Sequence, residues 1–507
     1  MFAVARGSAL LGISGMPVAV ETVVSRGLPS FDIVGLPDAA VRESRERVRA
    51  AVRNSGYDFP AGRITVNLAP ASIRKVGVGL DLPVAVSVLA AGGSVIGTRL
   101  PRTLLIGELS LGGALRAVRG VLPSCVAALR DGINAVVVPR SNVREAECVN
   151  GITVVPAADL EDALAFLRSG RIPRGRPATW VEPGEPVPQS DFSDVIGQQT
   201  AVRALEISVA GGHNLIMVGP PGSGKTMLAM RVPSILPPMT ASEALEVTCI
   251  QSVAGILPRG GLASERPMRA PHHSVSVLGM LGGGNPPAPG EITLAHNGVL
   301  YMDEFCEFPS AVLEALRGPM EEGVITVARS RLQVTFPCRF MLIASANPCP
   351  CGHLGDSTRP CVCGPEQVRR YRKRLLGPVG ERIDIQVEVS RVDHEDLARA
   401  SPGPRSCDIL ARVTEARAVQ MSRLGEAVRC NAAIGPGEIE KTAGLTAAAR
   451  RLLLDATEAL SLPVRAYHKL IRVSRTIADI EGSEPVLPPH VEEALQYRVL
   501  DVFAQEG

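Results

Sequence analysis

The chain has 507 residues, of which 46% are hydrophobic and 21% are charged, and its formal net charge is +2. This composition supports several buried cores and excludes global disorder, and at about 150 residues per domain the length predicts about three domains. The near-neutral charge excludes a polybasic or acidic tail, so any nucleic-acid surface has to be local.

The apolar stretches are too short for a membrane span. One of the longest, residues 82–91, has about half of the roughly 20 residues that cross a bilayer. The N-terminus shows no convincing signal-peptide cleavage region. The 11 cysteines lack the dense pattern of a small secreted disulfide scaffold. We therefore expect a cytoplasmic protein with no membrane partner.

Hydrophobic periodicity divides the chain into an α/β part, a linker, a second α/β part and a helical tail. The first part alternates helical and strand-like runs at residues 39–51, 63–68, 82–91, 121–130 and 135–139. This pattern predicts a mixed domain over residues 1–170, and the proline-rich residues 171–190 predict a linker. The order strand, glycine loop and helix predicts a nucleotide-binding domain over residues 191–400. Amphipathic runs at 445–460 and 464–480 predict a small helical bundle over residues 401–507.

A glycine-rich octapeptide follows an apolar run at residues 215–218. It fits the pattern G-x-x-x-x-G-K-[ST] and consists of Gly219, Pro220, Pro221, Gly222, Ser223, Gly224, Lys225 and Thr226. The glycines let backbone N–H groups surround a phosphate, the lysine neutralises phosphate oxygens, and the threonine hydroxyl is a ligand for Mg²⁺. The octapeptide therefore predicts a site for ATP or GTP with magnesium.

Two later strands end in polar side chains suited to the same chemistry. The apolar run 299–302 ends at Asp303 and Glu304, and the run 340–344 is followed by Asn347. Here an aspartate holds Mg²⁺, a glutamate polarises the attacking water, and an amide orients that water. Each ending alone also fits an ordinary strand end or turn. After a phosphate-binding loop, the three together predict nucleotide hydrolysis.

Four cysteines lie within fifteen residues, at Cys349, Cys351, Cys361 and Cys363. The spacing C-x-C-x₉-C-x-C can form a tetrahedral site of four thiolates, in which His353 could replace one ligand. Disulfides are the competing explanation, which a reducing cytosol disfavours. We predict a structural Zn²⁺ ion, because four thiolates leave no open position for catalysis.

The densest basic run of the chain, residues 369–374, follows this cysteine cluster. Next to a zinc hairpin, such a run could follow a phosphate backbone. The predicted DNA contacts are Arg369, Arg370, Arg372 and Lys373. A solvated or subunit-facing helix is the alternative.

The order of glycine loop, Asp-Glu strand and strand with Asn resembles the AAA+ ATPases. Four stretches are similar to the magnesium-chelatase-like ComM/YifB family: DVIGQQTAVRALEISVAGGHNL, RAPHHSVS, PGEITLAHNGVLYMDEF and NPCPCGHLGD. The first domain also fits, through FDIVGLPDAAVRESRERVRAA and ITVNLAPASIRK. The resemblance implies an ATP-hydrolysing homo-hexameric translocase or helicase that acts on single-stranded or branched DNA. Its implied role is branch migration during recombination of incoming DNA (competence), with a recombinase as a partner.

The resemblance also implies roles for single residues. Asn347 matches sensor 1, Arg382 in GERID matches the arginine finger that reaches the neighbouring subunit's ATP, and Arg465 in LPVRAYHKLIR matches sensor 2 on the helical lid. A guanidinium suits both arginine roles, because it is always charged and can meet two phosphate oxygens. The family usually has Leu-Asp before the finger, whereas Gly380 and Glu381 precede it here. A surface ion pair for Arg382 and a helix-face charge for Arg465 are the alternatives.

Two segments resemble DNA-facing parts of related AAA+ helicases. Residues 323–336 alternate well enough for a β-hairpin before sensor 1, with Arg329 and Arg331 at its tip facing DNA phosphates. An ordinary solvated turn is the alternative. Residues 268–289 resemble an insertion in helix 2, where Gly and Pro predict a loop. His272 and His273 are the natural pair to test there, with little support as a metal site.

Residues 105–139 are similar to the Lon protease domain, which has the ribosomal S5 domain 2-like α+β fold. Proteolysis of this type needs a serine nucleophile and a lysine. The stretch Gly79-Leu-Asp81 stands where the serine would fall, and no lysine occurs between Lys75 and Lys225. We predict a non-catalytic domain used for DNA binding or ring assembly. Ser72 and Lys75 form an S-x-x-K spacing without the companion motifs of a serine hydrolase.

Two functions therefore stay open on the sequence. The favoured one is the ATP-driven DNA translocase, supported by the Lon-like domain and the paired C-x-C hairpin. The alternative is a magnesium-chelatase-type ATPase motor subunit that acts through a partner to insert metal into a porphyrin. A pure binding module is a third interpretation, which the carboxylate of Glu304 disfavours.

Overall fold

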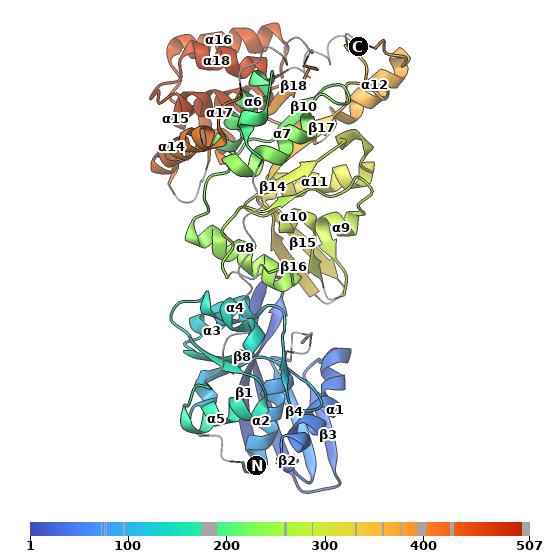
Figure 1. Ribbon diagram of the computed structural model, residues 1–507, viewed down its shortest axis with the longest axis vertical. Helices are drawn as coiled ribbons and strands as arrows, with labels where there is room; N and C mark the ends of the chain where they lie inside the picture. The colour runs from blue at the N-terminus through green and yellow to red at the C-terminus, as the bar shows by residue number, and fades with distance from the viewer. Residues whose placement is uncertain are drawn as a thin grey trace.

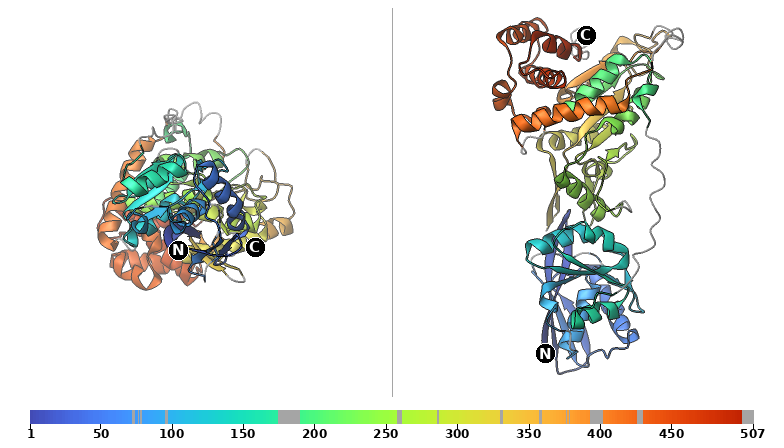
Figure 2. Two further views of the ribbon diagram at one scale, coloured as in Figure 1. Left: turned by 90° about the horizontal axis from the view of Figure 1, so that it is seen from below. Right: turned by 60° about the vertical axis from the view of Figure 1, so that its left-hand side comes forward.

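The structure is a computed structural model that describes residues 1–498 apart from 72–73, 76, 78, 95–96, 174–189, 258–260, 286, 330–331, 357–358, 376, 378, 393–401 and 426–429. Of Arg329 and Leu332 only the main chain is described. Most of the predicted linker, Ser72 and Arg331 lie outside the described residues. The molecule is elongated, with the N-terminal sheet at one end and the parallel sheet beside the C-terminal helices towards the other end (Figures 1 and 2).

The first sheet is mixed and has seven strands. In spatial order they are β3 (Ser30–Val34), β4 (Arg63–Ala69), β2 (Ser14–Ser25), β1 (Phe2–Leu11), β5 (Thr103–Leu105), β8 (Ala135–Pro139) and β9 (Thr153–Ala157). The pairs β1–β2 and β2–β4 are antiparallel, and the remaining neighbours are parallel. The strands predicted at 63–68 and 135–139 are confirmed as β4 and β8.

Five α-helices and a small hairpin complete the described residues of this part. They are α1 (Ala39–Asn54), α2 (Asp81–Ala91), α3 (Val121–Arg130), α4 (Val143–Glu147), α5 (Leu160–Ser169), β6 (Glu108–Leu109) and β7 (Leu115–Arg116). The apolar α2 is almost wholly buried, because it contacts β1, β2 and α1. The Asp38 carboxylate caps α1 by accepting the N–H of Val41 at 2.8 Å. The first three helices confirm those predicted at 39–51, 82–91 and 121–130.

The second sheet is parallel and has five strands. Their order is β11 (Met268–Arg269), β14 (Val299–Met302), β17 (Met341–Ala346), β10 (Leu215–Val218) and β18 (Ile385–Glu388). Every residue of β10, β14 and β17 is buried, as is usual for a parallel sheet that helices cover on both faces. Because the strands are parallel, their carboxyl ends lie at one edge, which is where ligands bind in open α/β sheets.

The elements around the second sheet are α6 (Gln199–Gly211), α7 (Lys225–Arg231), α8 (Ala241–Ala254), α9 (Val277–Leu281), α10 (Glu291–Leu294), α11 (Ser310–Glu322), α12 (Pro365–Leu375) and the short strands β12 (Gly282–Gly283) and β13 (Ala288–Pro289). The hairpin predicted at 323–336 is confirmed as β15 (Val324–Arg329) and β16 (Leu332–Pro337). The segment 268–289 is more regular than the predicted loop, because the Ser276 hydroxyl caps α9 by accepting the N–H of Gly279 at 3.1 Å.

The C-terminal part consists of helices, as predicted. They are α14 (Ser406–Leu424), α15 (Pro436–Thr442), α16 (Ala447–Ala459), α17 (Val464–Ile480) and α18 (Pro488–Gln496). Leu470 and Ile477 of α17 belong to the same hydrophobic core as Leu215 of β10. The helices therefore form one packed body with the parallel sheet.

The two sheets meet through α8 and the hairpin β15–β16. Cys249 of α8 joins the apolar cluster of α3, and the Ser252 hydroxyl donates a hydrogen bond to the Glu145 carboxylate. At the β1–β2 turn, a Cβ on Gly12 would lie 2.7 Å from Cγ1 of Val334. The hairpin therefore lies between the sheets (Figure 1). Among the helices that the structure describes, none combines the length and apolar character needed to cross a bilayer.

Candidate functional site

The glycine loop connects β10 to α7 at the carboxyl edge of the parallel sheet. Gly222 and Gly224 have φ values of 78° and 91°, a left-handed conformation that favours glycine. A Cβ on Gly219 would overlap the carbonyl oxygen of Val389. The backbone therefore needs glycine at these three positions, and the loop opens the N-terminus of α7 towards this edge.

Lys225 is buried at the start of α7. Its Nζ donates to the carbonyl oxygens of Gly219 at 2.7 Å and Pro220 at 2.9 Å, and lies 3.4 Å from Oδ1 of Asn347. Burial lowers the pKa of this lysine to about 8, although the charges of Asp303 and Glu304 oppose the shift. The ammonium of Lys225 and the amide of Asn347 thus lie together.

Asp303 follows β14 and faces the glycine loop. Its Oδ2 accepts the hydroxyl of Thr226 at 2.9 Å, and its Oδ1 accepts the hydroxyl of Ser345 on β17. Burial raises the pKa of Asp303, but the hydrogen bonds from Ser345 and Thr226 outweigh it and hold the pKa below its usual value. The two predicted magnesium ligands are therefore adjacent, and the carboxylate is kept ionised.

Glu304 has a strained backbone, with φ at 52°. Its N–H donates to the hydroxyl of Ser345 at 3.2 Å, which holds the turn in place. A non-glycine residue in this region costs about 1 kcal/mol, and such strain concentrates at functional sites. Ser345 was not among the residues predicted from the sequence, and its signal is a polar residue inside an otherwise apolar strand.

The histidine pair of the 268–289 segment lies beside Glu304. Nδ1 of His273 is 3.6 Å from Oε2 of Glu304, and the ring centroids of His272 and His273 are 4.0 Å apart. The ring of His273 also meets Phe308 edge-on. The insertion therefore contacts the predicted catalytic carboxylate, which the sequence did not indicate.

Arg382 and Arg465 lie together, away from the glycine loop. The turn Gly380–Arg382 precedes β18, which runs parallel to β10, so Arg382 is at the amino edge of the sheet. Its guanidinium pairs with Glu321 at the end of α11. Arg465 is 71% exposed and lies 3.5 Å from the carboxylate of Glu381. The structure brings the two predicted arginines to the edge opposite Lys225.

The departure from the family pattern before Arg382 has a steric reason. A Cβ on Gly380 would overlap the carbonyl oxygen of Leu375, the last residue of α12. The turn that carries Arg382 thus packs directly under the end of the basic helix.

The four predicted cysteine ligands converge. Their Sγ atoms all lie within 4.8 Å of one another, and Cys349 Sγ is 3.4 Å from Cys351 Sγ and 3.6 Å from Cys361 Sγ. A tetrahedral zinc site with Zn–S bonds of about 2.3 Å has sulfur atoms about 3.8 Å apart. A disulfide needs about 2.05 Å, so these separations do not fit the disulfide alternative. The cluster could hold a metal ion.

Main-chain hydrogen bonds favour the thiolate form of Cys351, whereas burial raises the pKa of Cys349 to about 12 and the pKa of Cys363 is also raised. Hydrogen bonds from the N–H groups of His353 and Val362 lower the pKa of Cys351 to about 6. The His353 ring itself faces Asp356, with 2.9 Å between Nδ1 and Oδ2. His353 is therefore outside the set of four ligands, and it supports the loop instead.

The cysteine loop (residues 349–363) packs against the glycine loop. A Cβ on Gly352 would lie 2.6 Å from Cδ of Pro221. Arg391 also contacts the glycine loop, because its guanidinium donates to the carbonyl oxygen of Pro221 at 3.0 Å. A metal held by the cysteines would thus stiffen one side of the nucleotide site.

Helix α12 carries the predicted basic run. Arg369, Arg370 and Lys373 are exposed, whereas Tyr371 packs against the core of the parallel sheet. Arg372 is half-buried. Arg374 donates to the carbonyl oxygen of Cys306 at 2.9 Å, two residues after Glu304. The helix therefore presents positive charge outwards and contacts the segment that follows Glu304, the predicted catalytic carboxylate.

In the N-terminal part, the position expected for a Lon-type serine is buried and ion-paired. Asp81 accepts Nε and Nη2 of Arg47 at 2.9 and 3.1 Å. Lys75 is buried and donates to the carbonyl oxygen of Pro70. Asp81 supplies a structural ion pair in place of a nucleophile.

The parallel sheet, the glycine loop and the Asp-Glu turn together define a P-loop ATPase-type α/β protein. Family models agree: residues 191–397 match magnesium chelatase subunit ChlI, residues 20–142 match subunit ChlI of Mg-chelatase, and residues 403–498 match its C-terminal region. The chain belongs to the ComM/YifB family of magnesium-chelatase-like proteins.

Relatives match nearly the whole chain. YifB of Salmonella typhimurium is 43% identical, over 98% of this chain and 97% of its own length. Competence protein ComM of Haemophilus influenzae is 40% identical, over 98% of this chain and 97% of its own length. The magnesium-chelatase 38 kDa subunit of Rhodobacter capsulatus is 25% identical, over 62% of this chain and 88% of its own length. The chain is thus similar over nearly its full length to the ComM/YifB proteins and over part of it to the chelatase subunit.

Proposed function

We propose that the protein is an ATP-hydrolysing homo-hexameric motor that moves single-stranded or branched DNA and promotes branch migration during recombination of incoming DNA. One observation carries the proposal. The residues for binding and hydrolysing ATP share one edge of the parallel sheet, whereas Arg382 lies at the opposite edge. Arg382 therefore cannot act on the nucleotide of its own subunit, and in this proposal it serves the site of a neighbour.

The geometry supports a different role at the nucleotide for each of the site residues. The loop N–H groups and Lys225 bind the phosphates, and Thr226 and Asp303 would hold Mg²⁺. When bound, magnesium neutralises phosphate charge. Glu304 accepts the proton of the attacking water, and Asn347, linked to Lys225, orients that water.

Arg382 is too far from its own glycine loop to act there. The four residues of β18 separate the two edges, which corresponds to about 10 Å or more of strand. Arg465 lies at the same corner of the subunit as Arg382, because it pairs with Glu381, the residue before Arg382. In a ring, this corner of one subunit would face the glycine loop of the next, and two guanidinium groups would meet the transferred phosphate.

The DNA part of the proposal rests on α12 and the hairpin. The exposed Arg369, Arg370 and Lys373 would follow a phosphate backbone, and Arg372 would join them, without reading bases. The contact of Arg374 with Cys306 links this helix to the segment that follows Glu304. Arg329 and Arg331 stay predicted contacts at the hairpin tip.

The proposed domains are a Lon-like non-catalytic domain (1–170), an AAA+ core (191–400) with a structural zinc hairpin (349–363), and a helical lid (401–507). The buried Asp81 supports the absence of proteolysis in the first domain. The name of the Haemophilus relative, a competence protein matched over nearly its whole length, supports a role in DNA uptake over the chelatase motor.

Hydrolysis measured with and without forked or four-way DNA tests the proposal. We expect DNA to stimulate the wild-type ATPase. Glu304→Gln should bind ATP but lose about 10²- to 10⁴-fold in hydrolysis. Glu307→Gln is the matched control, since Glu307 is an exposed carboxylate three residues further on. Hydrolysis without any DNA stimulation, together with activity towards tetrapyrrole partners, would reverse the choice in favour of the chelatase motor.

A further inference from the structure

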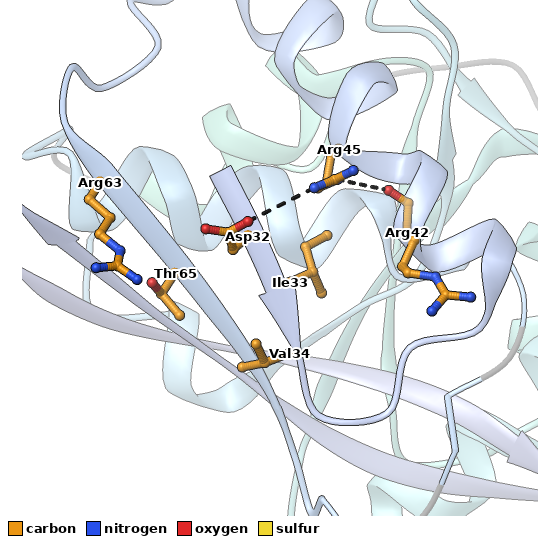
Figure 3. A pocket seen from close by; sticks show the side chains of 7 residues that line it. All are labelled: Asp32, Ile33, Val34, Arg42, Arg45, Arg63 and Thr65. Carbon is orange, nitrogen blue, oxygen red and sulfur yellow. Dashed lines mark hydrogen bonds and ion pairs between the residues drawn. The ribbon is translucent and has the colours of Figure 1, made fainter. Parts of the chain in front are cut away.

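A pocket on the N-terminal sheet gathers three arginines at the edge strand β3. It has a volume of about 340 Å³ and is lined by Asp32, Ile33, Val34, Arg42, Arg45, Arg63 and Thr65 (Figure 3). Arg42 and Arg45 come from α1, and Arg63 and Thr65 come from the outward face of β4. Three guanidinium groups and one carboxylate give the pocket a charge of +2, so it suits an anion.

Two of these arginines have no counter-charge of their own. Among the described residues, no carboxylate lies within 4 Å of the guanidinium of Arg42 or of Arg63. Both side chains are exposed and line the pocket, and Figure 3 shows them on opposite sides of β3, with Arg42 directed away from Arg63. Their positive charge has no carboxylate partner nearby, so the pocket favours a bound anion.

Arg45 is held in place between them. Its Nε donates to the carbonyl oxygen of Arg42 at 3.2 Å, and its Nη1 donates to the carbonyl oxygen of Phe31 at 3.5 Å. The same Nη1 lies 4.0 Å from Oδ1 of Asp32, a loose pair in which both side chains are about half exposed. Arg45 is thus oriented towards the pocket without being neutralised.

We propose that this pocket binds a phosphate group of a single-stranded nucleic acid. A guanidinium fork matches phosphate geometry, and the volume suits one nucleotide unit. Asp32 accepts a hydrogen bond from an N–H group of a base, such as N3–H of thymine, which an acidic peptide side chain cannot donate. Thr65 adds a hydroxyl, and Ile33 and Val34 add apolar surface for a sugar or base. The inference rests on the proposed function in single-stranded DNA and deepens it, because it assigns a strand-binding site outside the ATPase residues.

The test uses the full chain without ATP and a fluorescent single-stranded oligothymidylate. Arg42→Glu combined with Arg63→Glu should weaken binding about tenfold or more and reduce the salt slope by about 1.4, or about 0.7 for each lost phosphate contact. Arg53→Glu is the matched control, because Arg53 is an exposed residue of the same helix outside the pocket. It should keep wild-type affinity.

Hydrogen exchange on the wild-type protein locates the strand independently of folding of the variants. Oligothymidylate should protect the main chain of residues 30–34 and 40–46. Unchanged affinity of the double variant, or no protection of these residues, would overturn the proposal. Equal protection by polyglutamate, or by thymidine monophosphate at the same phosphate concentration, would overturn the assignment to a nucleic-acid strand.

Discussion

Substitution of Gly352 tests whether the cysteine loop supports the nucleotide site. A Cβ at this position would lie 2.6 Å from Cδ and 2.7 Å from Cγ of Pro221. Carbon atoms in contact prefer about 3.5–4.0 Å, so either the cysteine loop or the glycine loop has to move by about 1 Å. Gly352→Ala therefore disturbs the glycine loop without removing a metal ligand.

Gly355 offers a matched control in the same loop. Its φ is 80°, against 81° for Gly352, and a Cβ there would meet no atom within 4 Å. Both alanine variants carry the same backbone penalty of about 1 kcal/mol. The difference between them isolates the contact with Pro221, because overpacking costs about 1–3 kcal/mol.

The assay is binding of a fluorescent ATP analogue to both variants, with zinc content measured in the same samples. If the cost falls on the glycine loop, Gly352→Ala should bind about 5- to 150-fold more weakly than Gly355→Ala. The zinc content of the two should match. Equal affinity for the analogue would refute the coupling between the cysteine loop and the nucleotide site.

Three further predictions follow from the site. ATP affinity should fall as pH rises above about 8, by up to tenfold per pH unit, because the phosphates need a charged Lys225 and burial has lowered its pKa to about 8. Titrations should show this fall, Lys225→Arg should abolish it, and a flat wild-type profile would contradict it. Purified protein should contain about one equivalent of zinc, lost in Cys361→Ser and on acidification as the thiolates protonate; far less metal in protein prepared without chelators would contradict the site. Arg382→Ala should bind ATP but hydrolyse it about 10³-fold more slowly, and mixing it with Lys225→Ala subunits should restore part of the activity. Mixed rings that stay inactive would remove Arg382 from the neighbour's site.

The amino-acid sequence was sufficient for features whose parts are contiguous in the chain. The glycine loop needs only a strand, eight residues and a helix, and the structure has them in that order as β10, residues 219–226 and α7. The four cysteines and the basic face of α12 lie within one short stretch. Local spacing carries these features, because chain connectivity already limits how far their parts can separate.

Tertiary structure decided how distant segments meet. The position of β17 between β14 and β10 places Ser345 beside Asp303 and Asn347 beside Lys225. His273 reaches Glu304 from another segment, and no periodicity in the sequence indicates that contact.

The same holds for the arginines. The parallel direction of β18 places Arg382 at the edge opposite the glycine loop, and the edge position of β3 brings Arg42 and Arg63 around one pocket. Strand order and direction depend on which apolar faces pack together over the whole chain. Local sequence patterns predicted which segments form the nucleotide site. Tertiary packing decided which side chains of those segments contact one another.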